Sequence, residues 1–93
     1  MQATVTENPG RHRYEISVDG EPAGFTMYTL DGDVAIMPHT KIDPAYEGQG
    51  LASTLIGAAL DDLRERGMTV VPRCLFVRDF LEKHPEYQDL VKA

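Results

Sequence analysis

The chain has 93 residues, of which 42% are hydrophobic and 26% are charged, and it carries a formal net charge of −6. These values suit one soluble globular domain over residues 1–93, and no apolar run approaches the roughly 20 residues that a membrane span needs. The nine Lys and Arg residues are scattered, which argues against a nucleic-acid partner, since phosphate neutralisation needs clustered cations.

Cysteine usage and the N-terminal segment both bear on the compartment. Cys74 is the only cysteine, so neither an internal disulfide nor a zinc cluster of cysteines is available, and we expect no metal site. Residues 1–7 have neither the basic start nor the apolar middle of a secretion signal. We therefore expect a cytoplasmic protein.

The first part of the chain has the alternation typical of strands. Tyr14, Ile16 and Val18 alternate with polar residues, and residues 19–22 supply a turn to the next strand. Residues 4–7 either add an edge strand or form a loose arm, because their alternation is short and weak. The strand through Tyr14, Ile16 and Val18, the turn at residues 19–22 and the strand after it are predicted to form a hairpin.

Two further strands follow. Residues 25–30 predict a strand, residues 31–33 a turn, and the unbroken apolar run 34–37 is typical of a strand covered on both faces. Strands joined by such short turns pair antiparallel, so the first half of the chain is predicted to be an antiparallel meander.

From Leu51 the apolar period becomes helical. The apolar stripe comprises Leu51, Leu55, Ile56, Ala59, Leu60 and Leu63. Gly67 is expected to end this helix, and residues 68–71 predict a buried strand that Pro72 stops. The preceding strand, the helix and residues 68–71 form a strand–helix–strand crossover, whose two strands are expected to be parallel.

Two helices are predicted at the C-terminus. The second helix is marked by Phe76, Val77, Phe80 and Leu81. A short third helix is expected from Pro85 to near Val91. At this spacing Phe76, Phe80 and Tyr87 are more typical of a core than of a ligand site. The predicted fold is α+β: an antiparallel strand meander, then the crossover, then the C-terminal helices.

The segment before the long helix predicts an anion site. Gly48 and Gly50 allow a sharp turn with several N–H groups pointing inward, and the helix start adds about half a positive charge. The dinucleotide G-x-G-x-x-G and the Walker Gly-Lys-Ser/Thr patterns are both missing. From spacing alone, the two glycines could equally serve only a tight strand-to-helix connection.

Here the chain resembles the GNAT N-acetyltransferase superfamily, whose central motif is Gln/Arg-x-x-Gly-x-Gly/Ala; Gly50 and Ala52 fit its last two positions. The resemblance is closer to the very small GNAT-like proteins of about this length. It is carried by His39-Thr40, Gly48-Gln49-Gly50, Val71-Pro72-x-Cys74-x-Phe76-Val77 and His84-Pro85-Glu86-Tyr87. Glu47 departs from the motif's Gln/Arg, so we expect it to point outward and the cradle to be mainly backbone.

The resemblance implies that the chain binds acetyl-CoA. Its implied cofactor-binding residues are Thr40, Ile42, Gly48, Gln49, Gly50, Leu51, Ala52, Ser53 and Arg78. The glycine segment would hold the pyrophosphate, and the strand edge 39–42 would hold the pantetheine. This edge would form one wall of a wedge, and residues 70–74 would form the opposite wall. Arg78 would reach the 3′-phosphate, although a solvated helix charge explains it equally well.

Two residues are candidates for the chemistry. His39 is the leading base, because imidazole accepts a proton near neutral pH, with a structural histidine as the alternative. Cys74 lies at a predicted helix start; it is a nucleophile, a wall or acid of the cofactor channel, or an inert buried thiol. The family's usual Tyr acid is missing, since Phe80-Leu81 stands near its place.

The implied activity is transfer of acetyl from acetyl-CoA to a primary amine: a protein lysine, an N-terminus or a small amine. The short turn at 19–22 leaves no room for the helices that usually shape the acceptor pocket, which favours a protein segment. The alternative is a non-catalytic module that binds CoA or another protein. A structural domain without cofactor would require the glycine turn to be incidental.

Overall fold

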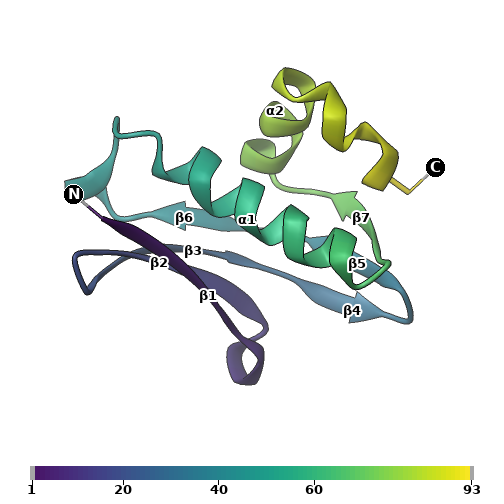
Figure 1. Ribbon diagram of the computed structural model, residues 1–93, viewed down its shortest axis with the longest axis horizontal. Coiled ribbons are helices and arrows are strands. Elements are labelled where there is room, and N and C mark those ends of the chain that lie inside the picture. The colour runs from purple at the N-terminus through teal and green to yellow at the C-terminus, as the bar shows by residue number, and fades with distance from the viewer. Residues whose placement is uncertain (1, 93) are drawn as a thin grey trace.

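The computed structural model describes residues 2–92 and places two α-helices on one side of a divided β-sheet (Figure 1). The strands are β1 (Ala3–Asn8), β2 (Arg13–Val18), β3 (Glu21–Met27), β4 (Thr29–Asp31), β5 (Val34–Met37), β6 (Thr40–Ile42) and β7 (Thr69–Pro72). The α-helices are α1 (Leu51–Glu65) and α2 (Leu75–Lys83), and the short 3₁₀ helices are η1 (Pro9–Arg11), η2 (Pro44–Tyr46) and η3 (Pro85–Leu90). The α+β class is confirmed.

The first sheet has the order β1-β2-β3-β6, and all its pairs are antiparallel. β1 pairs along its whole length with β2, so residues 4–7 belong to an edge strand and not to a loose arm. The β2–β3 turn is shorter than predicted, because Asp19 and Gly20 both take positive φ, 50° and 85°, and close a two-residue hairpin. Glu21 and Pro22 therefore already belong to β3.

The second sheet has the order β4-β5-β7. β5 and β7 are parallel, which confirms the crossover through α1. β7 includes Pro72, which pairs with Met37, so the strand does not stop before the proline. One helix at this end also differs from the prediction, since residues 85–90 form a 3₁₀ helix.

The chain changes sheets at two points. The resemblance implied an open edge at residues 39–42 opposite residues 70–74, but the sequence did not predict where the strands break. Residues 25–30 are not one strand, because Tyr28 leaves the ladder and its N–H donates to the His12 carbonyl over 3.0 Å. Between β5 and β6, Pro38 and His39 interrupt the strand in the same way. The sheet therefore divides into two parts that diverge from a common line.

Both α-helices pack on the same side of the sheets (Figure 1). The apolar stripe of α1, from Leu51 to Leu63, is buried, and the helix packs on the strands β1, β2, β3 and β6. On β5, Ala35 and Met37 are buried, but Val34 and Ile36 are only half-buried. The predicted burial of this strand on both faces is thus wrong, because the opposite face carries no helix.

The C-terminal end of α1 closes as Gly67 predicts. Gly67 has a φ of 72°, and its N–H donates to the Arg64 carbonyl while the N–H of Met68 donates to the Leu63 carbonyl, both over 3.0 Å. This pair of bonds is the Schellman motif, which favours glycine at the left-handed position.

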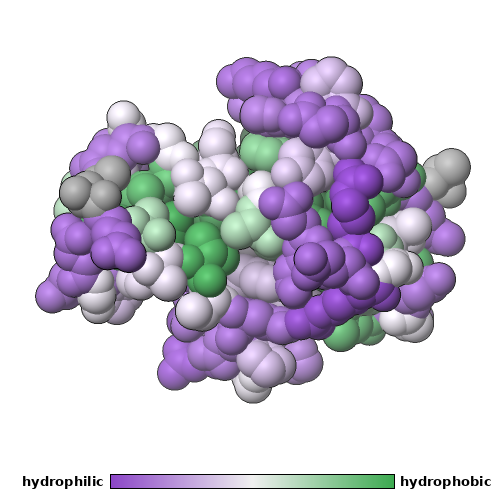
Figure 2. All heavy atoms as spheres, viewed as in Figure 1, coloured by the Kyte–Doolittle hydropathy of each residue, from purple (hydrophilic) through white to green (hydrophobic). Residues whose placement is uncertain are grey.

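The outer surface is mostly polar over the C-terminal helices. Figure 2 shows hydrophilic residues covering α2 and η3, with hydrophobic residues reaching the surface between this lobe and the end where β6 and the start of α1 lie. Within residues 2–92 no helix is long and apolar enough to cross a membrane.

Candidate functional site

The glycine loop before α1 borders open space. Gly48 and Gly50 have φ values of 82° and 73°, a left-handed conformation that side chains rarely adopt. A Cβ added at either position would meet no heavy atom within 4 Å. Gly50 is the N-cap of α1 and no side chain caps the helix there. The loop therefore presents bare backbone to the outside.

This backbone is rich in free hydrogen-bond donors. Within residues 2–92, no amide from Gly48 to Ser53 donates a hydrogen bond, and the first that does is Thr54, to the Gly50 carbonyl over 3.3 Å. The dipole of α1 adds partial positive charge at the same place. These features make the loop an anion-binding arrangement.

A groove of about 280 Å³ runs beside this loop. It is lined by Ile42, Tyr46, Glu47, Gly48, Gly50, Leu51, Ala52, Ser53 and Phe76. Leu51 is buried with 3% exposure, so its side chain belongs to the core and only its amide serves the loop. Gln49 is exposed and is not part of the groove lining. The structure thus brings most of the predicted cofactor-binding residues to one groove.

The groove continues along the open edge of β6. The His39 carbonyl accepts from the Met27 N–H over 2.8 Å, and the Asp43 N–H donates to the Ala23 carbonyl over 2.7 Å. Because strand residues alternate in direction, the backbone groups of Thr40 point away from β3. β6 is the last strand of its sheet, so these groups face no further strand.

Side chains on the inner face of β6 are already engaged. Thr40 is buried, and its hydroxyl hydrogen-bonds that of Thr26 over 2.8 Å. Ile42 shares its backbone direction, and its half-buried side chain packs against the core and borders the groove. Only the backbone of Thr40 and Ile42 is therefore free along the edge, as the predicted pantetheine contacts require.

A single carbonyl marks the point where the two sheets part. Met37 O accepts hydrogen bonds from the N–H groups of both Arg73 and Cys74, each over 3.1 Å. Beyond this point β6 pairs with β3, whereas β7 ends and the chain continues into α2. The result is a wedge with β6 on one wall and the start of α2 on the other.

The two predicted catalytic residues lie on either side of this apex. Cys74 is the N-cap residue of α2 and is buried, with 7% exposure. His39 is exposed, and its ring lies edge-on to Phe25 with centroids 5.9 Å apart. The backbone thus brings both residues to the wedge, while the imidazole packs toward the face without helices.

Two charged residues near the wedge have distinct placements. The Arg78 Nε donates to the Pro72 carbonyl over 2.9 Å, so this exposed side chain folds back on the end of β7 and does not line the groove. Glu47 is exposed and belongs to the groove lining. Glu47 was expected to point outward, and it adds an acidic residue to a groove whose lining also includes Ile42, Tyr46 and Phe76.

Two aromatic residues of the groove were not predicted. Phe76 is 49% exposed and lines the groove, whereas Phe80 is buried. The i, i+3, i+4 stripe of Val77, Phe80 and Leu81 could have indicated this, because Phe76 falls outside it. Tyr46 is half-buried at the end of η2, and its only signal was its position before the glycines.

Sequence comparisons point to N-acetyltransferases. A family model described as GCN5-related N-acetyl-transferase matches residues 13–90. Protein NATD1 from Bos taurus is 25% identical over 83 residues, which cover 87% of this chain and 74% of NATD1. The [ribosomal protein bS18]-alanine N-acetyltransferase of Escherichia coli (strain K12) is 26% identical over 72 residues, which cover 75% of this chain. This chain spans about half of that enzyme, since the match covers 49% of its length.

Solved structures have the same fold. The NMR structure of a GCN5-like putative N-acetyltransferase from Staphylococcus aureus superposes with a TM-score of 0.74 at 22% identity, covering 97% of this chain and 88% of that one. The crystal structure of the ribosomal-protein-S18-alanine N-acetyltransferase from Escherichia coli gives a TM-score of 0.62 at 26% identity, covering 64% and 39%. Because the family model spans residues 13–90, most of the sequence, this chain belongs to the GCN5-related N-acetyltransferase family.

Proposed function

We propose that this chain is an acetyl-CoA-dependent N-acetyltransferase that transfers an acetyl group to a primary amine, with a flexible protein segment as the favoured acceptor. One observation carries the proposal. The free amides of residues 48–53 lie beside an open strand edge at Thr40 and Ile42, so an anion and a strand-like linker can be held by one continuous surface. Acetyl-CoA has this composition, a pyrophosphate joined to an amide-containing pantetheine.

The glycine loop would hold the pyrophosphate. Each hydrogen bond to a charged group contributes about 1.5–3 kcal/mol, and the helix dipole adds about 0.3–1 kcal/mol. Several amides from Gly48 to Ser53 acting together are enough to offset the desolvation of the phosphates. The open space at Gly48 and Gly50 is where the ligand would lie, because a Cβ there meets no other atom.

The edge of β6 would hold the pantetheine and the thioester. Pantetheine contains two amide groups, which can pair with the outward backbone groups of Thr40 and Ile42 as an additional strand would. The thioester would then lie at the end of β6 nearest the apex, where the outward N–H of Thr40 would donate to its carbonyl oxygen and stabilise the developing oxyanion.

The acceptor amine must attack in its neutral form. A lysine-like amine with a pKa of about 10.4 is almost entirely protonated at pH 7, which costs about 4–5 kcal/mol, whereas an α-amino group costs about 1 kcal/mol. In the proposed step the amine nitrogen bonds to the thioester carbon, His39 or a water beside it takes the amine proton, and the C–S bond breaks. CoA thiolate leaves and is protonated.

Cys74 has two proposed roles that differ in the intermediate. In one, its thiolate attacks the thioester first and an acetyl-cysteine forms before the amine is acetylated. In the other, transfer is direct and Cys74 lines the channel or protonates the departing CoA. Cys74 is the N-cap residue of α2, beside the wedge where the thioester would lie, which is the position that both roles require.

A non-catalytic CoA-binding module is the second candidate. It is favoured by the burial of Cys74 and by the Glu47 carboxylate at the rim of the groove. Such a module would bind CoA and acetyl-CoA equally and would leave the thioester intact.

Calorimetry and intact-mass spectrometry test the proposal together. We expect wild-type protein to bind acetyl-CoA and to add about 42 Da to an amine-bearing peptide. Wild type, Cys74→Ala and Cys74→Ser are each mixed with acetyl-CoA alone, and the protein is examined for an adduct of about 42 Da. An adduct lost in both variants supports the covalent route. Binding without any transfer would support the module, and no binding would overturn both.

A further inference from the structure

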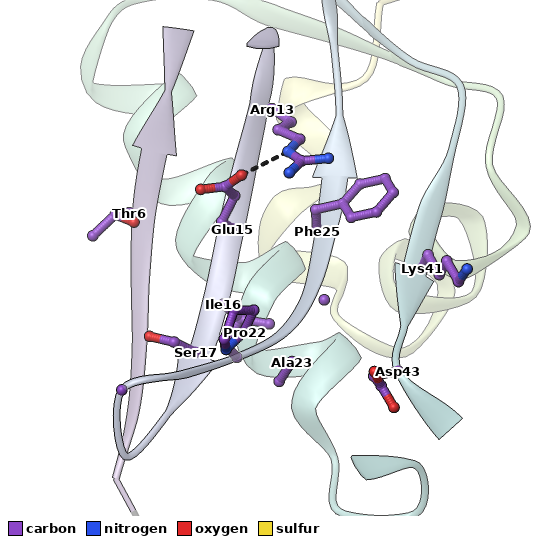
Figure 3. Close-up of a pocket in the computed structure, with 12 residues that line it drawn as sticks. Thr6, Arg13, Glu15, Ile16, Ser17, Pro22, Ala23, Phe25, Lys41 and Asp43 are labelled. Atoms are coloured by element: carbon purple, nitrogen blue, oxygen red, sulfur yellow. Dashed lines mark hydrogen bonds and ion pairs between the residues drawn. The ribbon is translucent and has the colours of Figure 1, made fainter. Parts of the chain in front are cut away.

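A second cavity, of about 410 Å³, lies on the face that carries no helix (Figure 3). Its floor is made of small residues, chiefly Ser17, Ala23 and Gly24. The cause is an irregularity in the β2–β3 ladder, where the register shifts between Ile16 and Ser17 and leaves Ala23 without a partner. We call this cavity the open-face hollow.

The upper wall of the hollow is formed by an ion pair and an aromatic ring. The Arg13 guanidinium lies over the Phe25 ring, 4.5 Å from its centroid, and Arg13 Nε pairs with Glu15 Oε2 at 2.7 Å. Figure 3 shows the three side chains together on this face. Because Arg13 and Glu15 neutralise each other, neither leaves a free charge in the hollow.

The same wall leads to the wedge. Phe25 contacts the ring of His39, at 5.9 Å between centroids. Side chains alternate along a strand, so Lys41 and Asp43 follow His39 on the same face, and both line the hollow. His39, Lys41 and Asp43 thus form a row from the wedge to the far end of the hollow.

Asp43 is the free anion of this row. Its Oδ1 accepts the Ala45 N–H over 2.9 Å, and within residues 2–92 the carboxylate makes no ion pair. The chain as a whole carries a net charge of −6, which attracts cations over a longer range. Lys41, nearer to the wedge, disfavours the protonated form of an amine placed beside His39.

We propose that the open-face hollow docks the acceptor as an extended basic peptide, with the reacting amine at His39 and a cationic side chain at Asp43. This assignment rests on the proposed acetyltransferase function. It names the substrate class: a protein segment with a Lys or Arg a few residues from the amine that is acetylated.

The length of the row supports a peptide. Four residue steps separate His39 from Asp43, which at ~3.3 Å per residue is about 13 Å. In an extended peptide, positions 1 and 4 are three steps, about 10 Å, apart, and the long Arg side chain at position 4 spans the remaining ~3 Å, so a cation at position 4 matches a reacting N-terminus. A short diamine does not reach both ends of the row.

A peptide series tests the spacing without depending on turnover. The probes are decapeptides with a free N-terminus and an amidated C-terminus, uncharged except for one Arg at position 2, 4 or 8. Each is titrated into isotope-labelled protein saturated with CoA, and amide shifts are followed by NMR. We expect the position-4 peptide to bind about two- to fivefold more tightly than the position-8 peptide, with the shifts at Ser17, Gly24 and Phe25.

Asp43→Asn is the decisive variant, because the Asn amide oxygen can still accept the Ala45 N–H. We expect it to remove the preference for position 4. Glu82→Gln, which removes one charge from an exposed position of α2, is the matched control and should retain the preference. Equal binding of the three peptides, shifts outside the hollow, or an unchanged preference in Asp43→Asn would overturn the assignment. Missing CoA-dependent shifts at residues 48–53 would instead count against the proposed function.

Discussion

Charged side chains link the C-terminal end of α1 to the sheet, whereas no charged side chain in residues 2–92 links its N-terminal end to the sheet. Tyr14 OH donates to Asp62 Oδ2 over 2.5 Å, and Arg66 pairs with the same carboxylate at 3.0 Å. Glu7, on β1, accepts hydrogen bonds from both Tyr28 and Arg66. These groups form a closed network in which each charge has a partner.

The N-terminal end has glycine where a capping side chain would be expected. Gly50 contributes no hydrogen-bonding side chain, and the amides of residues 48–53 donate to no group in residues 2–92. Relative to glycine, a capping Ser, Thr, Asp or Asn side chain would stabilise the helix by about a few tenths of a kcal/mol. The helix forgoes that contribution, which leaves its donors available for a ligand. The same helix thus serves folding at one end and the proposed binding at the other.

The largest expected effect comes from replacing the glycines at the two ends of α1 by aspartate. Gly50 and Gly67 have nearly equal φ values, 73° and 72°, and open space around each. Asp at either position costs about 1 kcal/mol in backbone strain. Gly50→Asp also places a carboxylate at the proposed pyrophosphate site, so we expect acetyl-CoA affinity to fall about 100-fold or more by calorimetry, a loss of about 2.7 kcal/mol. Gly67→Asp should bind normally, and equal losses in both variants would contradict the division of roles.

Tyr14→Phe should have the opposite profile. It removes the hydrogen bond to Asp62 and leaves a buried ring, so we expect the free energy of unfolding to fall by about 1–3 kcal/mol in urea titrations. Acetyl-CoA affinity should stay within twofold of wild type. Tyr87→Phe is the exposed counterpart, since its hydroxyl donates to Asp61 over 2.7 Å at the surface. A larger destabilisation there than at Tyr14 would contradict the importance of burial.

The network should also weaken at alkaline pH. Burial and the hydrogen bond to Glu7 raise the pKa of Tyr28 from 10.0 to about 12, and burial with the bond to Asp62 raises the pKa of Tyr14 as well. A phenol whose pKa is higher in the folded state stabilises the protein below pH 10, and this contribution is lost as the pH rises toward 12. Urea unfolding at pH 9, 10 and 11 should therefore show a shallower decline for Tyr28→Phe than for wild type. Parallel declines would show that Tyr28 is not linked to stability.

The smallest effect is expected at the surface clamp that joins α1 to η3. Arg64 pairs with Asp89 at 2.9 Å and donates to the Glu86 carbonyl over 2.8 Å, but its side chain is 42% exposed. Arg64→Ala should therefore cost only about 0.5–1 kcal/mol, and less in high salt, as measured by thermal unfolding. Arg64→Lys should recover part of the loss. A cost above that of Tyr14→Phe would reverse the proposed order.

What could be predicted from the sequence was local. The end of α1 at Gly67 follows from a glycine after a cationic turn, and the crossover follows from the change of period at Leu51. The resemblance implied an open strand edge at residues 39–42 opposite residues 70–74. The positions at which the sheet divides, Tyr28 and Pro38, were not predicted, because they depend on which distant strand each half pairs with. The residues of the glycine loop were identified through the family motif, and whether they bind acetyl-CoA stays a prediction.

The candidate site was harder to predict where side chains and faces matter. Phe76 was assigned to the core, although it is exposed at the groove. The open-face hollow arises from a register shift at Ser17, which no local pattern indicates. The short turn at residues 19–22 already indicated that the helices between the first strands are missing, but which side chains this exposes, His39 among them, depends on the whole fold.

The carbonyl of Met37, which holds the N–H groups of Arg73 and Cys74, has a consequence for how this site can evolve. This junction is held by hydrogen bonds between backbone groups, and the glycine loop likewise presents backbone groups. Most side-chain replacements therefore leave the junction at Met37 and the glycine loop unchanged. A protein that shares 22% of its residues can superpose with a TM-score of 0.74, as the Staphylococcus aureus structure does. Sequence change in such a site therefore alters the side chains around the groove sooner than it alters the backbone that forms the groove.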